Sequence, residues 1–235
     1  MSKNVLVTGA DTGLGLALVK RFLRGAYEVF AGVYHSAFDL NALTLEYGDS
    51  LALIPLDVAD MDSVRASVRQ VNERTATLDI IINNAGIHLK NSQLPLDELD
   101  LADGHLQRTM DVNTFGPLRV IQQFQPLLEK GDAKLILNIS SEAGSIADCR
   151  RESQFAYCMS KAALNMQSKI LQNYLGPRGF KVLAVHPGWM HTNMGGPDAP
   201  LPPGESAEGI FQLATREWIT ADPIYMDYRG NLLPW

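Results

Sequence analysis

Short apolar segments alternate with longer amphipathic segments along nearly the whole chain, and this alternation constrains the fold more than any other feature. The apolar segments carry almost no charge, as strands buried on both faces do. They cover residues 4–8, 28–33, 51–56, 78–83, 134–140 and 181–186. The amphipathic segments predict helices over residues 13–24, 39–47, 61–74, 103–129 and 154–175. This order predicts one α/β domain over residues 1–235, with a doubly wound parallel sheet of about seven strands.

The composition excludes several classes of protein. Hydrophobic residues make up 46% of the chain and charged residues 20%, as in soluble globular proteins. The net charge of −6 argues against a nucleic-acid partner, because phosphates select clusters of Lys and Arg. No segment reaches the ~18 apolar residues of a membrane span, and the first residues lack the long apolar region of a signal peptide. We therefore expect a cytoplasmic protein with no membrane partner.

The cysteines and histidines do not form a metal-binding pattern. The two cysteines, Cys149 and Cys158, are expected to be free thiols in a reducing compartment. Two cysteines do not complete a metal site, and the five histidines show no ligand-like spacing. The sequence predicts no metal.

A glycine-rich turn joins the first predicted strand to the first predicted helix. It reads Thr8-Gly9-Ala10-Asp11-Thr12-Gly13-Leu14-Gly15. Glycines let the backbone approach a pyrophosphate closely, and the helix N-terminus offers free N–H groups to that anion. The same glycines could form a tight turn with no ligand. The strand before the turn and the helix after it favour dinucleotide binding.

The end of the second predicted strand bears on the choice of cofactor. An acidic residue here would hold the ribose 2′-hydroxyl of NAD(H), but the segment reads Ala31-Gly32-Val33-Tyr34-His35. A 2′-phosphate would meet no carboxylate on this strand, although His35 is the one candidate cation and Asp11 nearby is unfavourable. The sequence favours NADP(H) over NAD(H).

Tyr157 and Lys161 are four residues apart at the start of a predicted helix and so share one face. A phenol has a pKa of ~10, too high for a base at neutral pH, and a neighbouring ammonium lowers it. The two residues can therefore form an acid/base unit. Taken alone, such a pair is usually an aromatic side chain packed beside a solvated lysine, and the other motifs are needed to favour the acid/base unit.

With these motifs in order, the chain resembles the short-chain dehydrogenase/reductase family over nearly its whole length, which implies a Rossmann-type fold. The matching segments are the glycine turn, Asp57-Val58, Asn83-Asn84-Ala85-Gly86, Asn113, Ile139-Ser140-Ser141-x-x-Gly144, Tyr157-x-x-x-Lys161 and Pro187-Gly188-x-x-x-Thr192. Within the family, residues 186–197 and 227–231 resemble the C-factor-like reductases. Seven motifs in the family's order leave little room for chance.

The resemblance implies a role for each matching residue. Tyr157 would exchange a proton with the substrate oxygen, and Ser141 would hydrogen-bond that oxygen. Lys161 would hold the nicotinamide ribose and lower the pKa of Tyr157, and Asn113 would anchor a water molecule. The implied cofactor contacts are Gly9, Asp11, Thr12, Gly13, Leu14, Gly15, Tyr34, His35, Asp57, Val58, Asn83, Asn84, Ala85, Gly86, Tyr157, Lys161, Pro187, Gly188 and Thr192.

The chain departs from the family at one place beside these residues. Tyr157 follows Ser141 by 16 residues, where about 13 is usual, which indicates a short insertion over residues 146–153. Its charged side chains could contact a polar or anionic substrate or form a solvated loop tip; they are Asp148, Arg150, Arg151 and Glu152. The adjacent Ser140 leaves the serine assignment open, although neighbouring side chains on a strand point to opposite faces.

These observations predict an NAD(P)(H)-dependent oxidoreductase that interconverts a small-molecule carbonyl and an alcohol. The Pro/Gly-rich residues 187–204 would cover the substrate, with Trp189, Met190 and Met194 either facing it or packing onto the domain. The alternative is a cofactor-binding signalling or scaffold protein of the same fold without turnover. A homodimer or homotetramer is expected from the family.

Overall fold

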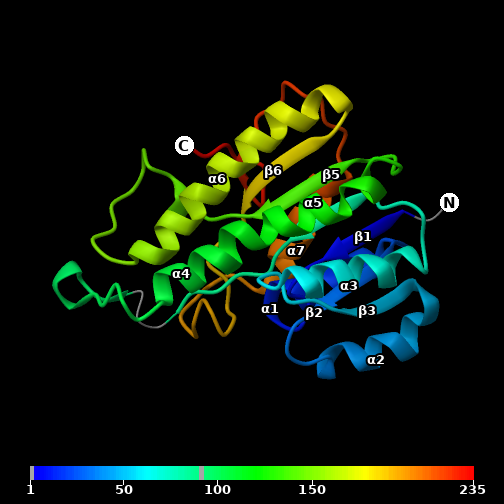
Figure 1. Ribbon diagram of the computed structural model, residues 1–235, viewed down its shortest axis with the longest axis horizontal. Helices are drawn as coiled ribbons and strands as arrows, with labels where there is room; N and C mark the ends of the chain where they lie inside the picture. The colour runs from blue at the N-terminus through cyan, green and yellow to red at the C-terminus, as the bar shows by residue number, and fades with distance from the viewer. Residues whose placement is uncertain (1–2, 90–92) are drawn as a thin grey trace.

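Seven parallel strands form one sheet in the computed structural model, which describes residues 3–89 and 93–235 (Figure 1). The strands are β1 (Asn4–Val7), β2 (Glu28–Val33), β3 (Leu51–Pro55), β4 (Ile80–Asn83), β5 (Leu135–Ile139), β6 (Lys181–His186) and β7 (Tyr225–Asp227). Their order across the sheet is β3-β2-β1-β4-β5-β6-β7. The direction of winding therefore reverses between β1 and β4, which is where open α/β sheets bind ligands.

Helices cover both faces of this sheet (Figure 1). They are α1 (Gly13–Arg24), α2 (Phe38–Tyr47), α3 (Met61–Asn72), α4 (His105–Met110), α5 (Gly116–Leu128), α6 (Phe155–Leu175) and α7 (Pro203–Thr215). One buried cluster joins the sheet to α1 and α7, and a second joins it to α3, α5 and α6. Burial of these two apolar layers is the main force that holds the fold together.

Most predicted elements are confirmed, and three features differ. The helix expected over residues 103–129 is interrupted by a π turn at Asp111–Phe115, which places Asn113 in a widened backbone. Helix α7 begins at Pro203, inside the segment predicted as a loop, because proline is well suited to the first turn of a helix. Strand β7 has only three residues, too few to show an apolar run.

The buried carboxylate of Asp79 joins three segments at the amino ends of the strands. Its oxygens accept hydrogen bonds from the backbone amides of Asn4 (2.8 Å) and Asp132 (2.9 Å), which precede or begin other strands. Asp79 is only 6% exposed, so water does not reach these amides to take the place of its carboxylate as the hydrogen-bond acceptor. The residue therefore fixes the start of β1 and the approach to β5.

We predict that Asp79→Ala destabilises the protein by about 2–4 kcal/mol, because charge-assisted bonds are lost and buried amides are left unpaired. Urea denaturation measures this. The matched control is Asp132→Ala, whose exposed carboxylate is removed while its backbone amide remains; it should change stability by less than about 0.5 kcal/mol. Equal unfolding midpoints for the two variants would contradict this role for Asp79.

Candidate functional site

The glycine turn between β1 and α1 has a backbone that only glycine allows at its closest points. Gly9 has φ +61°, and a Cβ there would lie 2.8 Å from the Cα of Ala85. A Cβ on Gly15 would lie 2.0 Å from the carbonyl oxygen of Gly9. The side chain of Thr12, at the N-cap of α1, makes no capping hydrogen bond. The first N–H groups of the helix are therefore free to bind an anion.

The end of β4 holds this turn in place. The Thr8 hydroxyl accepts hydrogen bonds from the backbone amides of Asn84 and Ala85, both at 3.0 Å. The side-chain amide of Asn84 donates to the carbonyls of Thr8 and Gly9, both at 2.9 Å. These four bonds close the gap between β1 and β4 and shape the crevice at the point where the winding reverses.

Other residues expected to contact a cofactor also lie around this crevice. The Asp11 carboxylate accepts from the backbone amide of Tyr34 at 3.0 Å, so it lies at the end of β2. A Cβ on Gly13 would lie 3.3 Å from the Thr192 side chain, which places the segment after β6 against the turn. Val58 is buried against Gly116 of α5.

Asn83 differs from its neighbours in the same motif. Its side chain is 2% exposed and donates to the side-chain carbonyl of Asn138 on β5 at 2.8 Å. Asn138 in turn donates to Ser168 of α6 at 2.9 Å. The Asn83 side chain therefore belongs to a buried polar chain that ties the sheet to α6, and only its backbone borders the crevice.

Lys161 is the buried cation of the site. It is 5% exposed, and its Nζ donates to the carbonyl oxygen of Ile139 at 2.8 Å. Among the described residues no carboxylate pairs with it, and burial lowers its pKa to about 8. An ammonium has three donors, so two of them remain available to a ligand beside Gly86.

Tyr157 lies one helical turn before Lys161, in the first turn of α6, with its ring centroid 5.7 Å from Nζ. Burial raises the pKa of the Tyr157 hydroxyl, and a hydrogen bond with Ser141 opposes this rise. The expected effect of Lys161 on this pKa stays a prediction. Among the described residues, the ammonium donates to the carbonyl of Ile139.

The two adjacent serines at the end of β5 point in different directions. The Ser141 hydroxyl lowers the pKa of Tyr157, and it accepts a hydrogen bond from the backbone amide of Ala143 at 3.1 Å. Ser140 is 1% exposed and donates to the side-chain carbonyl of Asn165 at 2.5 Å. Only Ser141 therefore borders the space next to Tyr157.

Asn113 fastens the π turn to the site. Its side-chain amide donates to the carbonyl of Ile87 at 2.9 Å and to the hydroxyl of Ser160 at 3.0 Å. Its side-chain oxygen accepts from the amide of Ile87 at 2.8 Å. Because both amide hydrogens are used, a water molecule at Asn113 would have to bind a carbonyl oxygen of this residue.

Two neighbours of Tyr157 were not predicted as site residues. The ring of His88 lies 4.5 Å from the ring of Tyr157, and burial together with the charge of Arg151 lowers the pKa of His88. Arg151, from the inserted segment, forms two hydrogen bonds with Glu142, the residue after Ser141. The unusual spacing between Ser141 and Tyr157 was the one signal in the sequence that the inserted segment, and with it Arg151, lies near these residues.

The segment after β6 has one apolar residue packed onto the domain and two that are exposed; whether those two face the substrate stays a prediction. Met190 packs against the main buried cluster and forms a β-bridge with Leu201. Trp189 is 58% exposed and Met194 is 48% exposed. Met190 thus anchors the segment, whereas Trp189 and Met194 have apolar surface left for another contact.

The crevice fits a dinucleotide in three respects. The backbone of the glycine turn leaves no room for side chains where a pyrophosphate would approach. The start of α1 offers uncapped N–H groups, and the buried Lys161 has two unused donors. A nicotinamide cofactor bound here would supply the hydride that the chain itself lacks.

Comparison with known proteins identifies the family. A model of the short chain dehydrogenase family matches residues 3–200. The chain belongs to this family. The predicted resemblance and the Rossmann-type fold are thereby confirmed.

Similar proteins agree with this assignment. The C-signal protein of Myxococcus xanthus is 37% identical over 164 residues, which cover 70% of this chain and 96% of the relative. An NADPH-bound carbonyl reductase from chicken fatty liver is 32% identical, with a TM-score of 0.90 over 100% of this chain and 99% of its own. The carbonyl reductase Sniffer of D. melanogaster is 28% identical, with a TM-score of 0.92 over all of both chains.

This short-chain dehydrogenase is an NAD(P)-dependent oxidoreductase that interconverts a carbonyl and an alcohol. The predicted enzyme class is therefore confirmed. Within residues 3–89 and 93–235, no helix combines the length and the apolar character needed to cross a membrane.

The lowered pKa of Lys161 predicts how stability depends on pH. Between about pH 8 and the unfolded value of ~10.4, the unfolded chain binds more protons than the folded one, so stability rises with pH. Relative to Lys161→Met, the natural protein should gain about 2–3 kcal/mol between pH 7 and pH 10.5. Urea denaturation at several pH values measures this.

The control is Lys169→Met, an exposed lysine on the same helix. That variant should keep the pH dependence of the natural protein. Parallel pH profiles for the natural protein and Lys161→Met would contradict the desolvated ammonium.

Proposed function

We propose that Tyr157 gives and takes the proton in this reaction and that Ser141 holds the reacting oxygen of the small-molecule substrate. The supporting observation is that the Ser141 hydroxyl acts on the Tyr157 hydroxyl and lowers its pKa, so the two groups are close enough to reach one substrate oxygen. During reduction the Tyr157 hydroxyl donates its proton to the carbonyl oxygen, and during oxidation the phenolate accepts it. The raised pKa of Tyr157 keeps the phenol protonated at neutral pH, as an acid in the reductive direction requires.

Lys161 and Asn113 complete this proposed catalytic set. The two unused N–H groups of Lys161 would donate to the hydroxyls of the nicotinamide ribose. A proton lost from Tyr157 would be replaced from solvent through Lys161 and a water molecule on a carbonyl oxygen of Asn113. The π turn supports this, because such turns change the hydrogen-bonding of nearby backbone carbonyls.

The cofactor would occupy the crevice between β1 and β4. The glycine turn would hold the pyrophosphate, and Asp57 and Val58 would flank the adenine. The segment from Pro187 and Gly188 to Thr192 would border the nicotinamide, and the rest of residues 187–204 would cover the substrate. Support comes from the side chain of Thr192, which lies beside Gly13 of the glycine turn. The segment after β6 is therefore next to the proposed pyrophosphate site.

We infer that the chain prefers NADP(H) over NAD(H). The residues at the end of β2, Tyr34 and His35, bear no carboxylate, and a similar carbonyl reductase is NADPH-bound. The Asp11 carboxylate works against a 2′-phosphate, but both of its oxygens accept from the backbone amide of Tyr34, at 3.0 and 3.2 Å. Gly32 does not offer a place for an added acid, because a Cβ there would lie 2.9 Å from the side chain of Leu56.

We predict that Asp11→Asn tightens NADPH binding about 5- to 10-fold, because a negative charge near the 2′-phosphate is removed, worth ~1 kcal/mol at a partly exposed position. NADH binding should change less than about twofold. Titration of cofactor fluorescence measures both, and Asp49→Asn is a control for net charge. Tighter binding of NADH than of NADPH by the natural protein would mean that Asp11 grips the ribose and that the preference is reversed.

The two serines give the most specific test of the proposed catalytic set. Both Ser141→Ala and Ser140→Ala lose a buried hydrogen bond, worth ~1 kcal/mol of stability. Only Ser141→Ala removes a donor to the reacting oxygen, so its turnover should fall about 10²- to 10³-fold. Turnover with a panel of aldehydes and ketones separates the two variants. A larger loss in Ser140→Ala would mean that Ser140 holds the reacting oxygen.

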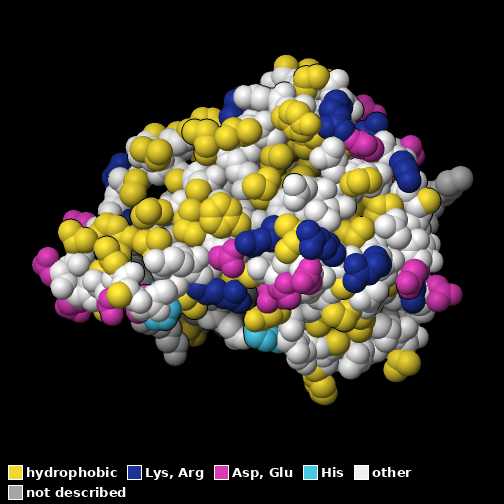
Figure 2. Space-filling model, in the orientation of Figure 1, with side chains coloured by type: hydrophobic (Ala, Val, Ile, Leu, Met, Phe, Trp, Pro, Cys, Tyr) yellow, Lys and Arg dark blue, Asp and Glu magenta, His cyan; other side chains and the backbone are white. Residues whose placement is uncertain are grey.

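We also propose that the chain pairs with copies of itself, as a homodimer or as a homotetramer built from such pairs. Apolar side chains gather over α5 and α6 in Figure 2. On α6 the exposed residues Met159, Met166, Ile170 and Tyr174 recur at helical spacing and form one stripe. A patch of this kind on a soluble protein marks a contact surface, and a two-fold axis would place the stripe against itself.

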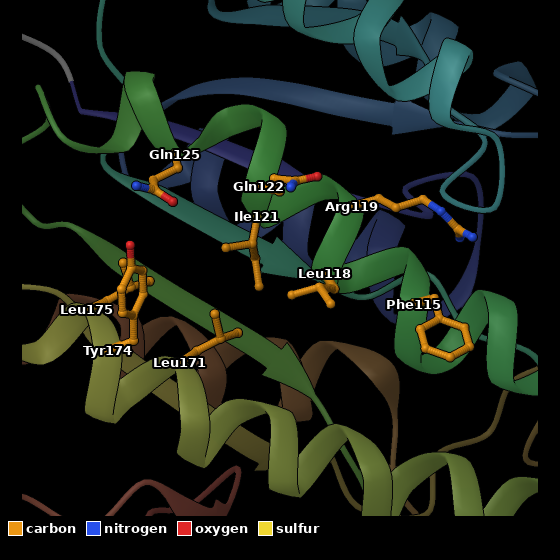
Figure 3. Close-up of a pocket in the computed structure, with 9 residues that line it drawn as sticks. All are labelled: Phe115, Leu118, Arg119, Ile121, Gln122, Gln125, Leu171, Tyr174 and Leu175. Carbon is orange, nitrogen blue, oxygen red and sulfur yellow. The ribbon is translucent and has the colours of Figure 1, made fainter.

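A groove between α5 and α6 continues this stripe (Figure 3). The residues that line it are Phe115, Leu118, Arg119, Ile121, Gln122, Gln125, Leu171, Tyr174 and Leu175. Leu118 and Phe115 are exposed at 42% and 49%. Side chains of a second copy could fill the groove and cover this apolar surface.

We predict that Ile170→Glu converts the assembly to monomers, because a carboxylate at the centre of the stripe would be buried unpaired. Sedimentation velocity measures the mass. Leu45→Glu, at an exposed position on α2 outside the stripe, is the control and should leave the assembly intact. An unchanged mass for Ile170→Glu would place the interface elsewhere.

A cytoplasmic location is also proposed. Both cysteines are free, and Cys149 is exposed on the inserted segment. Free exposed thiols persist in reducing compartments, which supports the assignment.

A further inference from the structure

The inserted segment places one arginine beside the candidate catalytic residues. Arg151 donates from Nη1 to Oε2 of Glu142 at 2.8 Å and from Nη2 to Oε1 at 2.7 Å. Glu142 directly follows Ser141 and starts a short 3₁₀ turn that the Ser141 hydroxyl caps. The planar, two-bond geometry fixes the guanidinium in orientation as well as in position.

The backbone of the segment is also fastened to the domain. The amide of Ala147 donates to the carbonyl of Trp235 at 2.8 Å, and the amide of Asp148 donates to the hydroxyl of Ser145 at 3.1 Å. Gln154 has φ +65°, which turns the chain sharply into α6. The segment is therefore an exposed loop whose backbone is fixed to the domain at two points.

The guanidinium of Arg151 is held near Ser141, because its partner Glu142 is the residue that follows Ser141. Its charge acts on the Tyr157 hydroxyl, on the Cys158 thiol and on His88. The ring of His88 packs on the ring of Tyr157, at 4.5 Å between centroids. Glu142 acts on the same hydroxyl with the opposite sign. Glu142 follows Ser141 directly, so this ion pair is the charged group that we place beside a substrate bound at Ser141 and Tyr157.

Arg151 has hydrogen-bonding capacity left for a ligand. A guanidinium carries five N–H donors, and Glu142 accepts from two of them. Among the described residues no other side chain or carbonyl accepts from Arg151, whose side chain is 33% exposed. The carboxylate of Glu142 already balances the charge, so an added anion would meet both attraction and repulsion. An uncharged oxygen would meet only a donor.

We propose that Arg151 is a specificity-determining residue that donates a hydrogen bond to a second, uncharged oxygen of the substrate, so that the chain prefers dicarbonyl compounds to simple ketones. The inference rests on the proposed function, because it places the reacting carbonyl at Ser141 and Tyr157. Glu142 acts as a positioning residue that orients the guanidinium and disfavours substrates with a carboxylate.

The test compares compounds of equal chain length: 2-hexanone, 2,3-hexanedione, 2,5-hexanedione and 5-oxohexanoate. In the natural protein, kcat/KM for at least one diketone should exceed that for 2-hexanone by about tenfold or more, the range for a donor matched to a substrate oxygen. In Arg151→Gln the ratio of these two values should fall about 10- to 100-fold, mainly through KM. Arg150→Gln, which removes the neighbouring exposed arginine, is the control and should keep the ratio.

Glu142→Gln is a second test, and its result would not change if Glu142 and Arg151 had only a structural role. It should raise kcat/KM for 5-oxohexanoate relative to 2-hexanone, because a repelling carboxylate is removed while the side chain can still hold Arg151.

The proposal is overturned if the natural protein does not prefer a diketone, if Arg151→Gln leaves the ratio unchanged, or if 5-oxohexanoate is the best substrate and loses most in Arg151→Gln. Failure of the proposed function looks different. In that case the natural protein oxidises NADPH with none of the four carbonyl compounds, although it binds the cofactor.

Discussion

The hydrogen bonds that join the ends of β1 and β4 set the positions of the other parts of the site. Thr8 and Asn84 exchange bonds across the gap, and each bond fixes backbone that would otherwise be free to separate where the sheet changes its direction of winding. The glycine turn can approach Ala85 only because Gly9 has no side chain. Strand order and these two polar side chains thus hold the glycine turn against the end of β4, where we propose that the cofactor binds.

Burial has a second effect at the opposite wall of the crevice. Lys161 is held as a desolvated ammonium with one protein acceptor, and Tyr157 as a desolvated phenol with one neighbouring hydroxyl. Each arrangement is unfavourable for folding, because a charge or a polar group is taken out of water without full compensation. Groups left in this state bind tightly to a ligand that completes their hydrogen bonds. The same side chains therefore reduce stability and prepare the site for chemistry.

The sequence was sufficient to predict the strands and helices that are marked by the spacing of apolar residues along the chain. The six predicted strands appear within two residues of their expected bounds, because buried parallel strands consist of short runs of uncharged, apolar residues. Helix α7 and strand β7 were not located. Helix α7 starts at Pro203, inside a Pro/Gly-rich segment that was predicted as a loop, and the three residues of β7 are too few to show an apolar run. The π turn around Asn113 leaves no mark in residue spacing.

Side-chain partners were harder to predict than elements. The assignment of Ser141 over Ser140 stays a prediction that turnover must test, but the geometry gives the two hydroxyls different neighbours. The burial of the Asn83 side chain with Asn138 depends on two strands that are 55 residues apart in the sequence. The pairing of Glu142 with Arg151 depends on the path of an inserted segment. Such contacts arise from tertiary packing, which no local pattern encodes.

Hydride transfer itself tests the central claim most directly. NADPH carrying deuterium at the reactive C4 position is incubated with the natural protein and a carbonyl compound, and the alcohol is analysed by mass spectrometry. We predict an alcohol one mass unit heavier for one of the two C4 stereoisomers, with formation slowed about 10²- to 10⁴-fold in Tyr157→Phe, the range for a lost general acid. An unlabelled alcohol from both stereoisomers, or an undiminished rate in Tyr157→Phe, would contradict the account.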